Sequence, residues 1–177
     1  MSKSTKIMAV FGVAAALGVA ALPLASYADN TYSATTDITV SINETFSVTA
    51  DATVNTSVTN NAAINATMKP HVTVTTNHAT GWVLSAQTSH TGGPALKSGS
   101  NEIDAGVPSV GTSAWALSGG DLTGYTALST SPTLVKSSSV ATDTTGVETE
   151  FTIGVTASPS QAAGSYTGTI TWTGAIH

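Results

Sequence analysis

The sequence has no cysteine and few basic residues, and both shortages exclude classes of function. Without cysteine, the chain forms no disulfide and carries no lipid on an N-terminal cysteine, so its stability must come from burial and strand pairing. Five lysines stand against ten acidic residues, a formal net charge of −5. Because nucleic-acid-binding proteins normally show a basic patch, this balance disfavours a nucleic-acid partner. Aromatic residues are also scarce, at 6% of the chain, which draws attention to its three tryptophans.

The first 28 residues read as a secretory signal peptide. Two lysines near the start precede an apolar run at residues 7–25, and residues 26–28 form an A-x-A-like cleavage site. Cleavage is expected before Asp29. The competing interpretation, an uncleaved membrane anchor, is disfavoured by Pro23 and by that cleavage site. Cleavage leaves three lysines against ten acidic residues, a formal net charge of −7.

Serine and threonine make up about a third of the remaining chain, a composition that fits either a disordered stalk or a β-rich surface protein. The alternation of apolar and polar residues favours the β-rich protein, because successive side chains of a strand point to opposite faces. The expected strands are 37–42, 46–50, 71–76, 81–89, 114–118, 149–157 and 165–173, with short strands near Leu96 and Ile103.

The expected fold class is all-β, a single antiparallel β-sandwich of Ig-like architecture. Its last two strands are separated by a stretch with Pro159 and Gly164, which predicts an antiparallel pair joined by a loop. Residues 51–68 mix alanine, asparagine and threonine and fit either a strand extension or a sheet edge. The expected organisation is a signal peptide at 1–28, N-terminal strands or an extension of the sandwich at 29–67, and the sandwich domain at 68–177.

Two Trp-x-Leu units recur in the chain, Trp82 with Leu84 and Trp115 with Leu117. Residues two apart share one face of a strand, so each pair is a candidate piece of core. Burying an aromatic side chain is worth roughly 4–6 kcal/mol as an upper bound, which a disulfide-free sandwich can use. The alternative is an indole that stays partly open and stacks on a sugar ring. Strand parity favours the core for Trp82 and Trp172, whereas Trp115, beside glycine-rich turns, fits either role.

Three segments resemble the WxL domain of bacterial cell-surface proteins. "VTVTTNHATGWVLSAQTS" is similar to that family's proximal Gly-Trp-x-Leu segment, "GTSAWALS" to its glycine-rich turn leading into a Trp strand, and "YTGTITW" to its distal Tyr-x-x-x-aliphatic-Thr-Trp signature. The distal motif continues here as Trp172-Thr173-Gly174, without the leucine. The resemblance implies a secreted domain that associates non-covalently with peptidoglycan or otherwise sits at the cell surface. The candidate ligand-binding residues are then Trp82, Leu84, Trp115, Leu117, Tyr166 and Trp172.

Catalytic and metal-binding motifs are scarce. Glu148 and Glu150 share one face of an expected strand, as do Glu102 and Asp104, but the glutamates have the parity opposite to Phe151 and are expected on a solvated face. The four histidines lack a metal-ligand spacing, and no nucleophile elbow or phosphate loop is found. We expect no enzymatic activity, no cofactor and no metal.

The function expected from these features is a non-enzymatic, exported surface protein whose partner is peptidoglycan or another cell-envelope glycan. Retention is expected to be non-covalent, because the sequence shows no Leu-Pro-x-Thr-Gly sorting signal and no C-terminal hydrophobic tail. The alternative is a structural subunit of a surface fibre or extracellular matrix, in which a strand pairs with the sheet edge of another copy or another surface protein. A secreted hydrolase of wall glycans rests only on the paired carboxylates.

Overall fold

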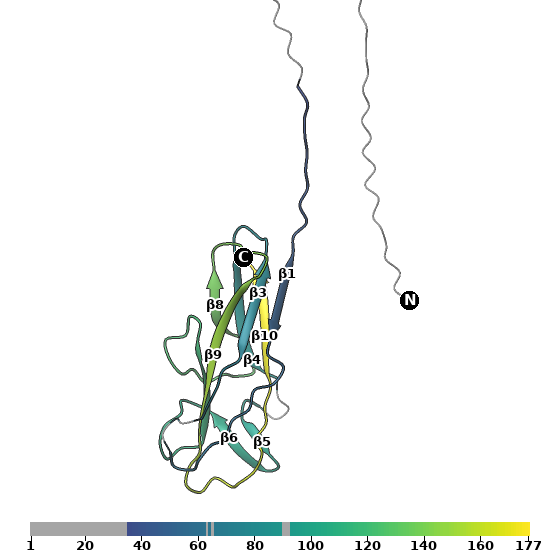
Figure 1. The fold of residues 1–177 in the computed structure, drawn as a ribbon. Coiled ribbons are helices and arrows are strands. Elements are labelled where there is room, and N and C mark those ends of the chain that lie inside the picture. Colours follow the sequence, from purple (N-terminus) through teal and green to yellow (C-terminus); the bar gives the residue numbers. More distant parts are fainter. Residues whose placement is uncertain (1–34, 63, 65, 90–92) are drawn as a thin grey trace, which may run out of the picture. The chain divides into compact units, whose positions relative to one another are not determined.

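A computed structural model describes residues 35–62, 64, 66–89 and 93–177, and the expected signal peptide lies outside them (Figure 1). The chain divides into two units at Val40. Every strand of the described residues belongs to the unit Ser41–His177, and residues 35–40 contain none. Within the described ranges, no helix is long and apolar enough to span a membrane.

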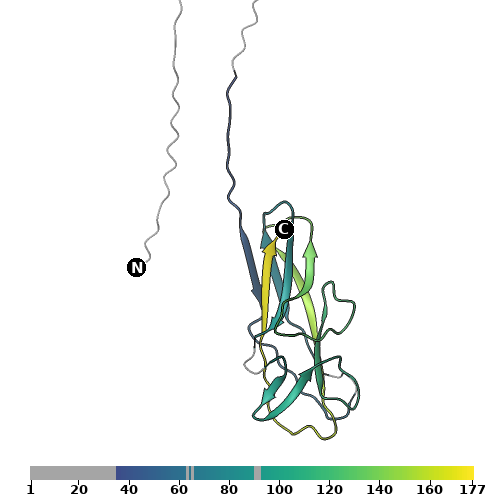
Figure 2. The same ribbon diagram turned by 180° about the vertical axis from the view of Figure 1, so that it is seen from behind.

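The ten strands of the described residues form two sheets packed in two layers (Figures 1 and 2). The smaller sheet has the order β10-β4-β8, and the larger has the order β1-β3-β9-β7-β6-β5, with β2 also paired to β9. Neighbours are antiparallel except β6 and β7, which are parallel. The expected all-β sandwich is therefore confirmed. The bounds are β1 (Phe46–Ala50), β2 (Ala66–Met68), β3 (His71–Thr76), β4 (Trp82–Thr88), β5 (Leu96–Ser98), β6 (Asn101–Ala105), β7 (Ala114–Gly119), β8 (Thr133–Ser138), β9 (Val147–Thr156) and β10 (Ile170–Ile176).

Strand β9 organises the larger sheet because its two halves have different partners. Residues 147–150 pair with β3, residues 151–156 pair with β7, and β2 adds to the other side of 153–155. Along β9, Phe151, Ile153 and Val155 are buried at alternate positions and belong to the core. Full burial of one such side chain contributes about 1.5–3 kcal/mol. The alternation predicted from the sequence is thus what directs this strand's apolar face inward.

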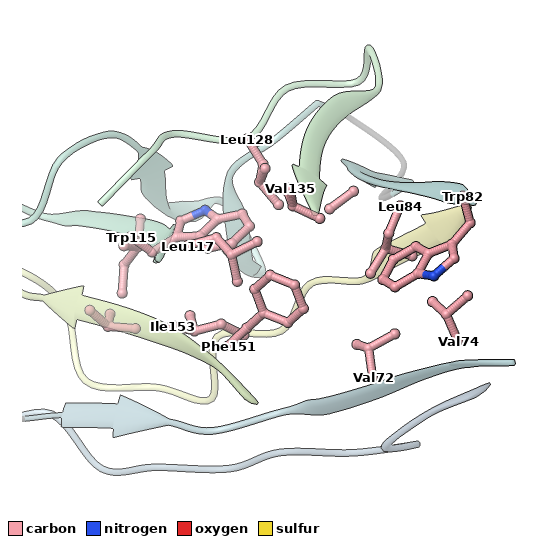
Figure 3. Close-up of a cluster of buried hydrophobic side chains, with 13 residues drawn as sticks. Val72, Val74, Trp82, Leu84, Trp115, Leu117, Leu128, Val135, Phe151 and Ile153 are labelled. Carbon is pink, nitrogen blue, oxygen red and sulfur yellow. The ribbon is translucent and has the colours of Figure 1, made fainter. Parts of the chain in front are cut away.

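The core is one connected cluster drawn from both sheets (Figure 3). At one end, Trp82 lies beside Val72 and Val74, and at the other end Trp115 lies near Ile153. At the side where β1 and β10 meet, Gly174 leaves room for the ring of Phe46, since a Cβ there would overlap it. Strand β1 is therefore part of the sandwich, which begins before Met68.

Three features differ from the sequence-based expectations. Residues 37–42 have strand-like alternation but form no strand, because no neighbouring strand pairs with them among the described residues. Strands β9 and β10 do not pair with each other: the chain after Ala157 crosses to the other sheet, where β10 pairs with β4. Strand β8 was not expected from the sequence, since its segment "TLVKSS" has few apolar residues. These differences all concern pairing, which depends on contacts distant in sequence.

Candidate functional site

The two Trp-x-Leu units lie in different sheets, and both belong to the core. Trp82 and Leu84 are on β4, with exposed fractions of 1% and 0%, and Trp115 and Leu117 are on β7, with 2% and 0%. The hypothesis that Trp115 is a solvent-exposed contact residue is therefore wrong. The apolar interior of the sandwich takes up that side chain, and the neighbouring glycine-rich turns do not keep it open. Trp172, expected in the core, is only partly buried.

Three of the six sequence-predicted residues meet at one cavity of about 320 Å³, which we call the aromatic cavity. Trp115 comes from β7, Trp172 from β10, and Tyr166 from the crossing segment before β10. Trp82, Leu84 and Leu117 are not among its lining residues. The cavity has the size of a small-ligand site, for which about 300–1,000 Å³ is usual.

Each of the three aromatic side chains is held by a specific contact. The indole N–H of Trp115 donates to the carbonyl of Pro94 at 3.0 Å. The hydroxyl of Tyr166 donates to the carbonyl of Ala162 at 2.7 Å and accepts from Gln161 Nε2 at 2.6 Å. The indole of Trp172 packs on the ring of Phe151, with centroids 4.8 Å apart. Because the polar atoms of Trp115 and Tyr166 already have partners, these two rings present mainly apolar surface to the cavity.

The rest of the aromatic cavity combines apolar residues with a polar rim. Sequence reasoning had not assigned Met68, Pro70, Ile153 or Ile170 to a site. Ile170 could have been found, because it has the same strand parity as Trp172, whereas Met68 and Pro70 carry no local signal of it. At the rim, the exposed Thr53 and Thr169 provide hydroxyls. A mostly apolar cavity with a few polar groups is the general pattern of a small-ligand site.

Among the described residues that line the aromatic cavity, Asp51 is the only charged one, and it belongs to a chain of ionisable groups. Its carboxylate accepts from the main-chain N–H of His71 at 2.9 Å and lies 3.3 Å from Nδ1 of that ring. These hydrogen bonds from His71 lower the pKa of Asp51. On the other side of the ring, Nε2 lies 3.5 Å from Glu150, whose pKa is lowered mainly by its hydrogen bond from Lys69. The carboxylate at the cavity rim is consequently ionised at neutral pH.

A second cavity, of about 640 Å³, adjoins the first. Both are lined by Val54, Met68, Leu96 and Tyr166, among others. None of the described residues that line the second is charged, and we call it the neutral cavity. Leu96 of β5, Ile103 of β6 and Val155 of β9 contribute apolar side chains to its lining, together with residues of the loop segments 54–60 and 161–167.

The four residues of the acidic pairs are not among the lining residues of either cavity. Glu148 and Glu150 are exposed on β9, and Glu102 and Asp104 are exposed on β6. Glu150 pairs with Lys69 at 2.8 Å, and Glu102 pairs with Lys97. Among the residues that the structure describes, no group of three or more histidine and acidic side chains could hold a metal ion.

Comparison of the chain with known protein families, with curated proteins and with solved structures finds no match. The resemblance to the WxL domain therefore rests on the three quoted motifs alone.

Proposed function

We propose that this chain is a non-enzymatic, exported surface protein that binds a bacterial cell-envelope glycan non-covalently in the aromatic cavity, with peptidoglycan as the first candidate. The single observation that carries the proposal is the meeting of Trp115, Tyr166 and Trp172 at one cavity. The partly buried Tyr166 and Trp172 supply accessible aromatic surface there, the buried Trp115 completes the lining, and hydroxyls lie at the rim. Aromatic rings offer a large apolar surface to the C–H face of a sugar, while hydroxyls satisfy its polar edge.

The charge of the chain favours an uncharged region of the glycan as the ligand. With a net charge of −7 after the expected cleavage, the protein is repelled by anionic wall polymers. Asp51 at the rim adds a local negative charge. The proposal therefore requires binding to sacculi from which the anionic polymers have been removed. It also requires export, so the protein purified from outside the cell should have the intact mass of a chain that begins at Asp29.

Co-sedimentation with purified peptidoglycan sacculi tests the proposal, using variants that alter the rim without touching the core. Thr169→Arg places a long side chain at the exposed rim of the aromatic cavity. Thr173→Arg adds the same charge to β10 at an exposed position outside both cavities, and is the matched control. We expect Thr169→Arg to weaken binding about tenfold, which corresponds to about 1.4 kcal/mol, and Thr173→Arg to leave it unchanged.

Thermal melts of both variants check that the fold is intact. Denatured protein should lose sacculus binding, because the three aromatic residues meet only in the folded chain. Equal recovery of native and denatured protein in the supernatant would contradict the proposal. Equal sacculus binding by Thr169→Arg and Thr173→Arg would show that the glycan does not bind in the aromatic cavity.

A further inference from the structure

Residues 37–42 carry an apolar face that is exposed. Ile38, Val40 and Ile42 have exposed fractions of 82%, 77% and 84%. They alternate with Asp37, Thr39 and Ser41, so in an extended chain the three apolar side chains share one face. Such a pattern is typical of a strand with one buried face, yet no strand of the described residues pairs with this segment. Binding to another surface would remove these three apolar side chains from water.

The neutral cavity offers a surface with the same period. The C-terminal part of β9 and the residue after it place Val155 and Ala157 in its lining, two residues apart, beside Ile103 and Leu96. Residues of the loop segments 54–60 and 161–167 also line the cavity, and no strand of the smaller sheet does so among the described residues. A strand bearing Ile, Val and Ile on one face spans about 13 Å between its first and last apolar side chains. On its other face, Thr39 and Ser41 suit a lining in which the described residues carry no charge, whereas the charged Asp37, the first residue of the segment, must stay at the solvent-exposed edge of the cavity.

The point where the exposed segment joins the sandwich and the neutral cavity lie at opposite ends of the unit Ser41–His177. Asn77 fixes the point where the segment joins the sandwich: its side chain donates to the carbonyl of Asn43 and accepts from the N–H of Thr45, both at 2.8 Å. This point lies at the end that carries the C-terminus, whereas β5 and β6, which line the cavity, lie at the other end (Figures 1 and 2). In a contact between unlike ends, one copy contributes its segment and the other its cavity. Each copy then still has one of the two available for a further copy, so the contact can repeat into a fibre.

We propose that residues 37–42 of one copy insert in an extended conformation into the neutral cavity of a second copy. Burial of Ile38, Val40 and Ile42 against the apolar side of the cavity would supply affinity and register. Main-chain hydrogen bonds would come from loop segment 54–60, because β9 at Val155 and β5 at Lys97 are already paired on both edges. Repetition of the contact builds a head-to-tail fibre. The inference goes beyond glycan binding, which uses the neighbouring aromatic cavity, and either can hold without the other.

Cross-linking between two single-cysteine variants tests the contact, since the chain has no cysteine of its own. Val40→Cys places a thiol on the exposed segment, and Ala163→Cys places one at the exposed wall of the neutral cavity. The two purified proteins are mixed and oxidised, so that any mixed dimer joins two chains. The matched control for the second partner is Thr144→Cys, on the exposed loop between β8 and β9. We expect a mixed dimer with Ala163→Cys and none with Thr144→Cys, and equal yields would overturn the proposal.

Replacement of the three apolar residues of the exposed segment tests whether the segment is needed for fibre formation. In the triple variant Ile38→Asp, Val40→Asp and Ile42→Asp, the changed side chains are exposed, so the sandwich should fold and sacculus binding should persist. We expect filaments of the wild-type protein in electron micrographs of concentrated samples, and their loss in the triple variant. A wild-type protein that stays monomeric in size-exclusion chromatography at high concentration would overturn the proposal, and so would filaments formed equally by the triple variant.

Discussion

The indole of Trp172 and the ring of Phe151 join the two sheets of the sandwich. Their centroids lie 4.8 Å apart and their planes are tilted by 34°, with Trp172 on β10 of the smaller sheet and Phe151 on β9 of the larger. Aromatic pairs in this geometry contribute about 0.5–1.5 kcal/mol beyond the area that they bury. One residue therefore serves both as a contact between the sheets and as part of the aromatic cavity.

Trp172→Ala should lower the free energy of unfolding by about 2–4 kcal/mol, somewhat less than the loss of a fully buried tryptophan. Trp172→Phe should cost less, because a ring remains to pack on Phe151. Urea unfolding followed by circular dichroism measures both. If Trp172→Ala left the stability unchanged, the contact between the sheets would not depend on this pair.

Replacement by phenylalanine should lower the free energy of unfolding by different amounts at the two buried tryptophans, Trp82 and Trp115. The indole N–H of Trp115 donates to Pro94, whereas that of Trp82 is buried without a hydrogen-bond partner among the described residues. Trp115→Phe leaves the carbonyl of Pro94 unpaired, and Trp82→Phe removes an unpaired donor. We expect Trp115→Phe to be the more destabilising by about 1–3 kcal/mol in urea unfolding. Equal losses would mean that the Pro94 hydrogen bond adds no net stability.

Gly81, which precedes Trp82, should not tolerate a side chain. Its φ is +91°, and a Cβ there would overlap the main chain of Ser138 on the neighbouring β8. Gly111 is the matched control, with a φ of +83° and open space around it. Gly111→Ala should cost about 1–2 kcal/mol from backbone strain alone. Gly81→Ala should cost about 1–3 kcal/mol more, because the steric overlap is added, and thermal melts of the two variants give the difference.

Acid should destabilise the fold through the carboxylates that are hydrogen-bonded in it. The pKa values of Asp51 and Glu150 are lowered from their ordinary values of 3.8 and 4.5. A lowered pKa means that the folded state favours the ionised form, so the stabilisation is complete above the ordinary value and is lost as the pH falls through the folded-state value. The melting temperature should therefore fall on acidification from about pH 5 to below pH 3.

Asp51→Asn should weaken this acid dependence, because it removes one of the carboxylates. Asp104→Asn is the control, since the exposed carboxylate of Asp104 makes no hydrogen bond to the described residues. Both side chains of the Asp51 and His71 pair are well exposed, so solvent screens the effect and the shift should be small. If the melting temperature of Asp51→Asn depended on pH in the same way as that of the wild type, the contact with His71 would not contribute to the acid sensitivity of the fold.

The sequence by itself determined the fold class and the inward face of most strands. Alternation along β3, β4 and β9 is a local property of an extended backbone, so it could be read without knowing which strands pair. The same parity correctly placed Trp82 in the core. It could not show that Trp115 is buried, because glycine-rich turns beside a strand do not reveal what packs over it.

Only the tertiary structure decided which strands are neighbours and where distant residues meet. Strand β10 pairs with β4 instead of β9 because the crossing segment carries it to the other sheet, a choice made by long-range packing. For the same reason Trp115, Tyr166 and Trp172 meet at one cavity while Leu84 and Leu117 do not line it. Residues 37–42 show the limit most clearly: their alternation signals a strand, but a strand exists only where another backbone satisfies its hydrogen bonds.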